Sequence, residues 1–171
     1  MSNDALQNIS SISEAELTTP SSTQRFPLGM EITTGQPFGT STNVKKWKYL
    51  QAHGALSQYG VYAVKGAYAS NATKFKTAAA ASLAVYTEYG VAPVAVTSGY
   101  YFWLQISGDC TVLAEGSTAT AGNTLNVINA KATATDSSGT TVSTATFALA
   151  NTSTSSTTCT ATLLGSLVIV A

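Results

Sequence analysis

The sequence predicts a mainly β protein, either an antiparallel β-sandwich or a small β-barrel, with an extended N-terminal arm. Three observations predict it. Short apolar runs rich in Val, Tyr and Thr recur after residue 25, turn sequences containing Gly, Asn, Asp or Ser separate them, and helical periodicity is almost absent. The first 25 residues are instead rich in Ser and Thr and contain no aromatic residue. We therefore divide the chain into an arm (1–25) and a β-rich domain (26–171).

The arm contains a short apolar pattern. Leu6, Ile9 and Ile12 recur every three residues, which predicts one apolar stripe on a short helix that begins behind Asn3 or Asp4. We expect this stripe to anchor the arm on a neighbouring protein. The alternative is a frayed chain terminus.

The stretch 88–115 organises the predicted domain. Its three expected strands are Gly90–Val96, Tyr100–Ser107 and Cys110–Ala114. Thr97-Ser98-Gly99 is expected to form the first turn, because Gly99 can adopt a positive φ, and Gly108-Asp109 the second. Pro93 cannot donate to a sheet ladder, so it indicates an edge or a bulge.

Four consecutive aromatic residues begin the middle strand of this stretch: Tyr100, Tyr101, Phe102 and Trp103. Side chains alternate along a strand, so Tyr100 and Phe102 are expected on a core face and Tyr101 and Trp103 on the opposite face. Aromatic residues at such positions commonly fill cores and subunit contacts, which is the role we predict for all four. Stacking against a sugar is the alternative.

The remaining elements follow the same alternation of apolar runs and turns. Further strands are predicted at Met30–Thr33, Thr42–Ala52, Tyr59–Lys65, Asn71–Lys76, Leu125–Asn129, Lys131–Thr135, Thr141–Ala145, Thr146–Ala150 and Cys159–Val170. The segment Asp136–Gly139 is expected to form a hairpin loop, and Gly165 a bend or bulge. The alanine-rich segment Thr77–Leu83 is expected to form one helical turn or a loop, since it is too short to hold a helix alone.

Charge is scarce and balanced. Charged residues make up 9% of the chain, against roughly 25% in ordinary soluble domains, and the formal net charge is zero. This composition provides no basic field for nucleic acid or an acidic membrane. No apolar run approaches the roughly 20 residues that span a bilayer, and the N-terminus lacks the pattern of a signal peptide. Either partners cover much of the surface, or the exterior is rich in hydroxyl groups.

The chain lacks a recognisable set of catalytic or metal-binding residues, so we expect no enzyme activity, cofactor or metal site. His53 is the sole histidine, no nucleophile elbow or phosphate loop is present, and two cysteines with one histidine do not make a zinc site. Cys110 and Cys159 are expected to be buried thiols, with one disulfide as the alternative. The carboxylates available for acid–base chemistry are Glu31, Glu88, Asp109, Glu115 and Asp136. Glu88 and Glu115 bracket the central strands, and surface solvation accounts for these two.

The segment 90–125, GVAPVAVTSGYYFWLQISGDCTVLAEGSTATAGNTL, resembles a segment of the capsid decoration, or cement, proteins of tailed bacteriophages. The matching residues are Gly90-Val91-Ala92, Ser98-Gly99, Tyr101–Gln105, Gly108, Thr111–Leu113 and Ala121–Leu125. The resemblance covers about a fifth of the chain. It implies a β-rich subunit, usually trimeric, that sits on the outer capsid surface and braces the major capsid protein. Such a subunit is made in the host cytoplasm. The matched pattern describes strand packing, so it transfers no catalytic residue.

Our functional hypothesis from the sequence is therefore mechanical: a homotrimeric capsid decoration protein. Two alternatives come from other classes. A receptor- or carbohydrate-binding module of a virion fibre or adhesin predicts an exposed aromatic patch. A small hydrolase predicts His53 in a cleft beside a carboxylate.

Overall fold

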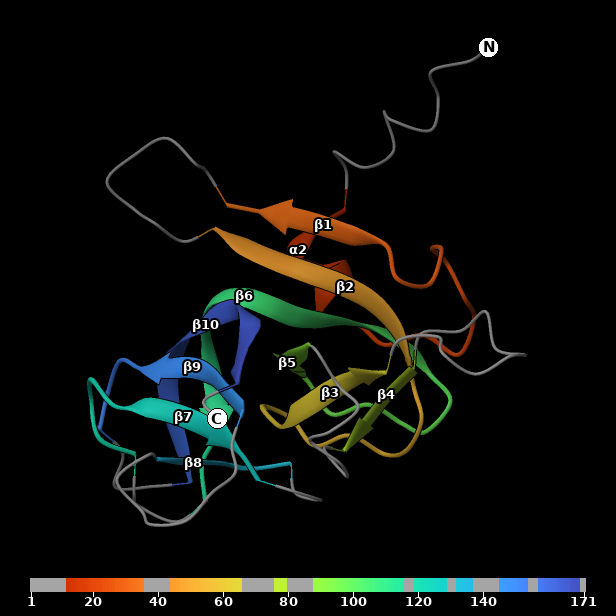
Figure 1. The fold of residues 1–171 in the computed structure, drawn as a ribbon. Helices are drawn as coiled ribbons and strands as arrows, with labels where there is room; N and C mark the ends of the chain where they lie inside the picture. The colour runs from red at the N-terminus through yellow and green to blue at the C-terminus, as the bar shows by residue number, and fades with distance from the viewer. Residues whose placement is uncertain are drawn as a thin grey trace.

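The computed structural model describes residues 12–35, 44–65, 76–79, 88–115, 119–128, 132–136, 145–153 and 157–169. Over these residues the chain is mainly β, with one four-residue helix, and the predicted fold class is confirmed (Figure 1). The elements are α2 (Glu14–Leu17), β1 (Glu31–Thr34), β2 (Lys45–Ala52), β3 (Val61–Lys65), β4 (Lys76–Ala79), β5 (Tyr89–Val91), β6 (Tyr101–Leu113), β7 (Thr124–Val127), β8 (Ala134–Asp136), β9 (Ala145–Ala150) and β10 (Thr158–Ile169).

The described strands form one sheet in the order β1-β2-β4-β3-β5-β6-β10-β9-β7-β8. An additional pairing joins β2 to β6, so β2, β4, β3, β5 and β6 close into a small five-stranded barrel. The strands β10, β9, β7 and β8 continue from β6 as an antiparallel sheet, which forms the second lobe in Figure 1. Among these pairings β2–β4 is parallel and the others are antiparallel.

The long strand β6 belongs to both lobes. Its first half pairs with β2, from Tyr101 opposite Gln51 to Ser107 opposite Lys46, and its second half pairs with β10 as far as Leu113 opposite Thr158. The predicted turn at Gly108-Asp109 is therefore wrong, because the chain runs straight through it. Gly108 instead takes a φ of 87°, next to a register shift between β2 and β6, where β6 changes partner.

Among the residues that the structure describes, three hydrophobic clusters form the core. One lies in the barrel, around Leu50, Phe102, Leu104 and Ile106. The second lies under the β7–β10 lobe and contains Val112, Leu125, Phe147 and Leu163. The third covers the outer face of β2 and β6, where Leu17, Ile32, Trp47, Tyr49 and Trp103 are buried. The first half of β6 is therefore buried on both faces, by the barrel cluster on one side and the outer cluster on the other.

Other predicted elements agree or differ locally. The turn before Tyr100 is confirmed, with Gly99 at a φ of 83°, and Gly165 lies in the predicted irregularity, where the β9–β10 register shifts between Leu163 and Val168. The helical turn or loop expected from Thr77 is wrong for residues 77–79, which pair in β4 with β3 and β2. Alanine's helix preference is weak and yields here to strand pairing. Most of the strand expected at Asn71–Lys76 lies outside the described residues.

The structure also corrects the prediction made for Asp136. This residue was expected in an exposed hairpin loop, but it ends β8, opposite Leu125, and is 2% exposed. Its carboxylate accepts hydrogen bonds from the backbone N–H of Thr120 (2.8 Å) and the side-chain amide of Asn123 (2.9 and 3.0 Å). These donors replace the water that a buried carboxylate would otherwise need. No helix among the described residues is long and apolar enough to span a membrane.

Candidate functional site

The N-terminal segment is docked on the domain from Ile12 onward. Ser13 and Glu16 form a reciprocal capping box at the start of α2, which satisfies two backbone N–H groups of this short helix. Leu17 from the same helix is buried against the outer aromatic cluster. Ser21 then exchanges two backbone hydrogen bonds with Tyr101 (2.9 and 2.8 Å), so the segment runs alongside the start of β6.

Of the three residues predicted to anchor the arm, the structure describes only Ile12. Ile12 packs against the chain's own outer cluster, whereas Leu6 and Ile9 lie outside the described residues. The capsid contact predicted for these three residues stays a prediction. The helix that does form begins after Ser13, and the sequence signal that predicts it is S-x-x-E from Ser13 to Glu16.

The outer cluster is built on aromatic contacts between β2, β6 and the segment before β1. Tyr49 lies 5.0 Å from Trp103 and 5.2 Å from Phe26 between ring centroids, and its ring stacks on Tyr101 at 6.2 Å. Burial raises the pKa of the Tyr49 hydroxyl, which accepts a hydrogen bond from the Arg25 backbone N–H. Edge-to-face and offset pairs of this kind add to the stabilisation from burial alone.

The four aromatic residues singled out in the sequence do not share one environment. Phe102 faces the barrel interior and Trp103 the outer cluster, each 2% exposed, and Tyr101 packs at the edge of that cluster. Tyr100, expected on the core face, is instead 37% exposed because it belongs to the turn before β6. The subunit contact predicted for this group stays a prediction.

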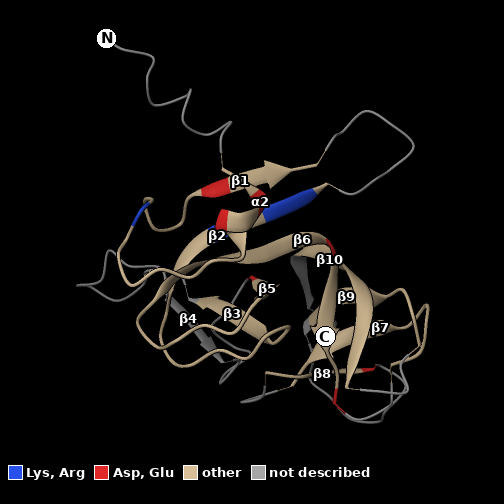
Figure 2. Cartoon of the chain, turned by 180° about the vertical axis from the view of Figure 1, so that it is seen from behind, with Lys and Arg blue, Asp and Glu red and all other residues tan. Residues whose placement is uncertain are grey.

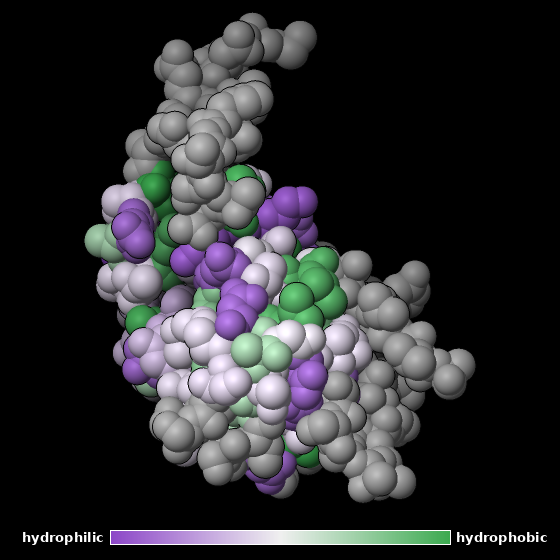
Figure 3. Space-filling model, turned by 90° about the vertical axis from the view of Figure 1, so that its left-hand side faces the viewer, coloured by the Kyte–Doolittle hydropathy of each residue, from purple (hydrophilic) through white to green (hydrophobic). Residues whose placement is uncertain are grey.

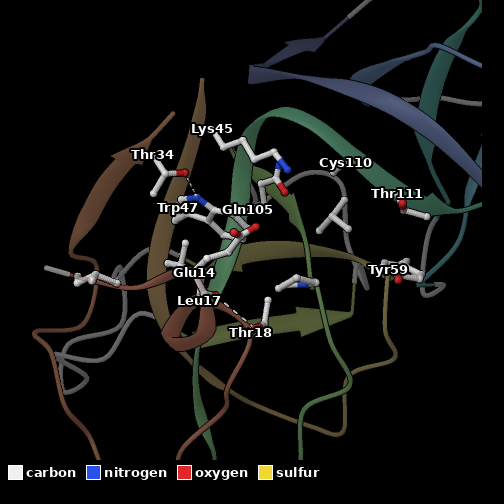
Figure 4. A pocket seen from close by; sticks show the side chains of 13 residues that line it. Glu14, Leu17, Thr18, Thr34, Lys45, Trp47, Tyr59, Gln105, Cys110 and Thr111 are labelled. Carbon is white, nitrogen blue, oxygen red and sulfur yellow. Dashed lines mark hydrogen bonds between the residues drawn. The ribbon is translucent and has the colours of Figure 1, made fainter. Parts of the chain in front are cut away.

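A pocket of about 570 Å³ opens between the docked N-terminal segment and the barrel. Its lining residues come from six separate parts of the chain: Ile12, Glu14, Leu17, Thr18, Thr34, Lys45, Trp47, Tyr59, Val91, Pro93, Gln105, Cys110 and Thr111. Figure 4 shows the side chains of Glu14, Lys45 and Gln105 directed toward the same part of the pocket. The α2 segment therefore forms one wall of this pocket.

Two residues of the pocket are held tightly in place. The Gln105 side chain is 3% exposed, and its amide donates to the backbone carbonyls of Asp109 (2.9 Å) and Ser107 (3.2 Å). Tyr59 has a φ of 61°, the left-handed region that a bulky residue rarely adopts. Its backbone N–H donates to Ala92 and its carbonyl accepts from Leu113, and these two bonds hold the strained conformation.

An ion-pair cluster ties β1, β2 and the start of β5 together. The Lys48 ammonium lies 2.8 Å from a Glu31 carboxylate oxygen and also pairs with Glu88. Burial alone would lower the pKa of Lys48, but the two carboxylates outweigh it and raise that pKa. Figure 2 shows blue on β2 and on a neighbouring loop; Lys65 and Lys76 lie at the ends of β3 and β4, while the sequences of β7, β9 and β10 contain neither Lys nor Arg.

The outward face of the β7–β10 lobe is rich in threonine and poor in charge. Leu149 pairs directly with Thr162, and Leu164 lies two residues further along β10, so the two leucines are diagonal neighbours on one face. They are 38% and 46% exposed. We call this surface the threonine face; by strand register it comprises Asp109, Thr111, Thr124, Leu149, Thr160, Thr162 and Leu164. Figure 3 shows one side of the molecule, on which pale and hydrophilic residues surround a hydrophobic patch.

A hydrogen-bonded network orders part of the threonine face. The Thr162 hydroxyl donates to the Asp109 carboxylate and accepts from the Asn151 side-chain amide (2.9 Å), while Thr152 and Thr160 bond through their hydroxyls (3.0 Å). These bonds restrict the side chains before any partner arrives. A face prepared in this way loses less rotamer entropy on association.

Groups with reactive chemistry lie apart from one another. His53 is exposed on the bend after β2 and does not line the pocket. Cys110 and Cys159 are both free thiols; burial raises the pKa of Cys110 to about 12 and also raises the pKa of Cys159. Across the ranges that the structure describes, no group of three His, Cys, Asp or Glu residues is arranged to hold a metal ion.

No protein-family model and no curated protein sequence matches this chain. Among solved structures, the chain is similar to the N-terminal base of the head fibre protein gp8.5 of bacteriophage phi29. The two chains are 17% identical, and the likeness covers 71% of this chain and 96% of that one with a TM-score of 0.47. A likeness this distant carries no argument about function, so function is argued from this chain's own residues.

Proposed function

We propose that this chain is a virion structural protein that decorates the outside of an assembled capsid as a homotrimer, contacts the major capsid protein and stabilises the shell. The observation that carries the proposal is the threonine face, which exposes two leucines side by side among hydroxyl groups. The resemblance of residues 90–125 to capsid decoration proteins supports it independently. We propose no nucleic-acid or membrane partner.

The threonine face is suited to contact by shape. Asp109 is the one charged residue of the face, and its carboxylate already accepts a hydrogen bond from the Thr162 hydroxyl. Covering the face therefore carries a small desolvation penalty for charged groups. Fully burying a leucine contributes about 1.5–3 kcal/mol, and Leu149 and Leu164 have part of that surface still to bury. The interface cores of proteins are depleted in charge in the same way.

Decoration stabilises a shell by mass action. A protein that binds the assembled state and not the free subunits shifts the equilibrium toward the assembled state. A homotrimer presents three copies of the threonine face together, and their joint binding raises avidity without any new contact. The proposed role of the arm is to add contacts from each copy at the edges of this footprint.

Binding to capsids tests the proposed surface. The double variant Leu149→Lys and Leu164→Lys places two cations on the threonine face, and it should lose occupancy on capsids assembled without the native protein. The matched control is Gln58→Lys, which adds a cation at an exposed turn outside the threonine face. Occupancy is measured by sedimentation of capsids with each purified variant, and solution mass by light scattering gives the oligomeric state. Equal occupancy for the double variant and the control would refute the proposed surface.

Truncation tests the arm separately. Deleting residues 1–11 leaves the docked segment intact, while deleting residues 1–25 also removes Leu17 and uncovers the outer cluster. We expect the shorter deletion to lower occupancy on capsids while leaving the thermal unfolding midpoint unchanged. Unchanged occupancy would remove Leu6 and Ile9 from the capsid contact.

A further inference from the structure

We infer that the pocket beneath α2 is a binding site for a neutral saccharide of one or two rings. This site shares only Thr111 with the threonine face, and it also differs from the run Tyr100–Trp103, where sugar stacking was the alternative use. The inference goes beyond capsid decoration and does not depend on it. It rests on the size of the pocket, the chemistry of its lining and the strained backbone of one lining residue.

The size of the pocket fits a small ligand. Its volume of about 570 Å³ falls within the roughly 300–1,000 Å³ usual for small-molecule sites. The walls are supplied by α2, by the β1 and β2 strands, by Tyr59, by β5 with Pro93, and by β6. A site lined by this many separate segments is concave on several sides, as Figure 4 shows, and can surround a ring-shaped ligand.

The lining suits a neutral molecule covered in hydroxyl groups. Its charged groups are one carboxylate, Glu14, and one ammonium, Lys45, so the site has no net charge to attract an ion. Sugar hydroxyls both donate and accept. Glu14 offers an acceptor, Lys45 a donor and Gln105 its side-chain carbonyl oxygen, since both of its amide N–H groups donate to the backbone. Threonine hydroxyls from Thr18, Thr34 and Thr111 add further partners.

The lining also contains apolar and aromatic residues. Among them are Tyr59, Val91 and Pro93, together with Ile12 and Leu17 from the N-terminal segment. The carbon-bound hydrogens of a pyranose ring form an apolar face that packs on surfaces of this kind. A lining that combines polar groups with apolar side chains suits a sugar ring, whereas a phosphate or a metal ion requires concentrated charge.

The backbone of Tyr59 is the observation that separates a site from a chance cavity. A left-handed φ is unfavourable for a bulky side chain, and glycine would adopt it freely. Strained residues of this kind cluster at functional sites, because the surrounding structure holds a side chain where it is needed. Here Tyr59 is the third residue of the turn closed by the Gly60 N–H and the Ser57 carbonyl, two further backbone hydrogen bonds hold it, and it lines the pocket.

The test measures saccharide binding by the full chain and three variants. The probes are glucose, galactose, N-acetylglucosamine, maltose and lactose, and the readouts are saturation-transfer NMR and tryptophan fluorescence, since Trp47 lines the pocket. Tyr59→Gly removes the ring and relieves the strained φ, so the protein should stay folded. Glu14→Gln alters a polar wall at an exposed position. Tyr100→Ala is the control, because it removes an exposed aromatic ring outside the pocket.

We expect saturable binding of at least one probe, a loss of about tenfold or more in affinity for Tyr59→Gly and for Glu14→Gln, and no change for Tyr100→Ala. Thermal unfolding of each variant shows whether it is folded. If no probe binds, if both pocket variants bind like the native chain, or if only Tyr100→Ala loses binding, the inference is overturned. Capsid occupancy of Tyr59→Gly should equal that of the native chain, so failure here leaves the decoration proposal standing.

Discussion

Two glycines with nearly the same backbone conformation allow a sharp test of how β6 joins the lobes. Gly99 and Gly108 have φ values of 83° and 87°. A Cβ added at Gly99 meets nothing within 4 Å, whereas at Gly108 it would lie 2.3 Å from the Val44 carbonyl oxygen and 3.1 Å from the Lys45 Cα. Because those atoms belong to the backbone, a side chain at Gly108 forces β2 away from β6.

The two substitutions to alanine should therefore differ in cost. A left-handed alanine costs about 1–2 kcal/mol, and the lower entropy of the unfolded alanine chain offsets about 0.4–1 kcal/mol of that. Gly99→Ala should lower the free energy of unfolding by about 1 kcal/mol from these two effects. Gly108→Ala adds an overpacking cost of about 1–3 kcal/mol, which gives about 2–4 kcal/mol in total.

Urea unfolding followed by tryptophan fluorescence measures both losses, since Trp47 and Trp103 are buried beside the two strands. The slope of the free energy with urea should be unchanged in each variant, which would show that both unfold from an equally compact state. Equal losses for the two variants would refute the reasoning, because they would mean that β2 does not lie against Gly108.

Three further predictions concern buried groups. Trp103→Ala should lower the free energy of unfolding by about 3–5 kcal/mol, measured by urea unfolding, while Tyr100→Ala, at an exposed position, should change it by no more than about 0.5 kcal/mol. The raised pKa of Lys48 means that its ion pairs stabilise the fold fully below the unfolded lysine pKa of about 10.4 and lose that effect as pH rises through the folded value. Lys48→Met should therefore flatten the alkaline fall in thermal midpoint; an unchanged profile would contradict this. Cys110, with a pKa of about 12, should not react with a disulfide reagent at pH 8 until urea unfolds the chain.

The sequence predicts an element correctly where residues close together in the chain determine its conformation. Gly99 was identified as a turn glycine from its neighbours, and the alternation that buries Phe102 and Leu104 was readable within one strand. The capping box of Ser13 and Glu16 is also visible in the sequence, as S-x-x-E. The stripe Leu6, Ile9 and Ile12 predicts a helix that begins earlier than the observed one. In each case the residues of a single turn, strand or helix start are enough to predict the local structure.

Features set by distant partners could not be read in this way. Gly108-Asp109 has the composition of a turn, and only the presence of β10 and the Val44 carbonyl beside it explains a continuous strand. Asp136 lies in a loop-like D-S-S-G run, and its burial depends on Thr120 and Asn123, which are 16 and 13 residues away. The pocket needs six separate segments, and no sequence pattern indicates the left-handed φ of Tyr59.

The docking of the N-terminal segment limits what the proposed arm can do. Leu17 covers Trp47, Tyr49 and Trp103, so a segment that left this position to reach a capsid would expose a large aromatic surface to water. Uncovering one buried leucine alone costs about 1.5–3 kcal/mol, and the aromatic rings beneath it add to that. The same departure would remove one wall of the pocket. Contact with a neighbour therefore falls to residues before Ile12, unless a second copy supplies an equivalent segment to the same aromatic face. Mixing two differently tagged forms of the protein after deletion of residues 1–11 would separate the two cases, because exchanged segments would hold the copies together and docked ones would not.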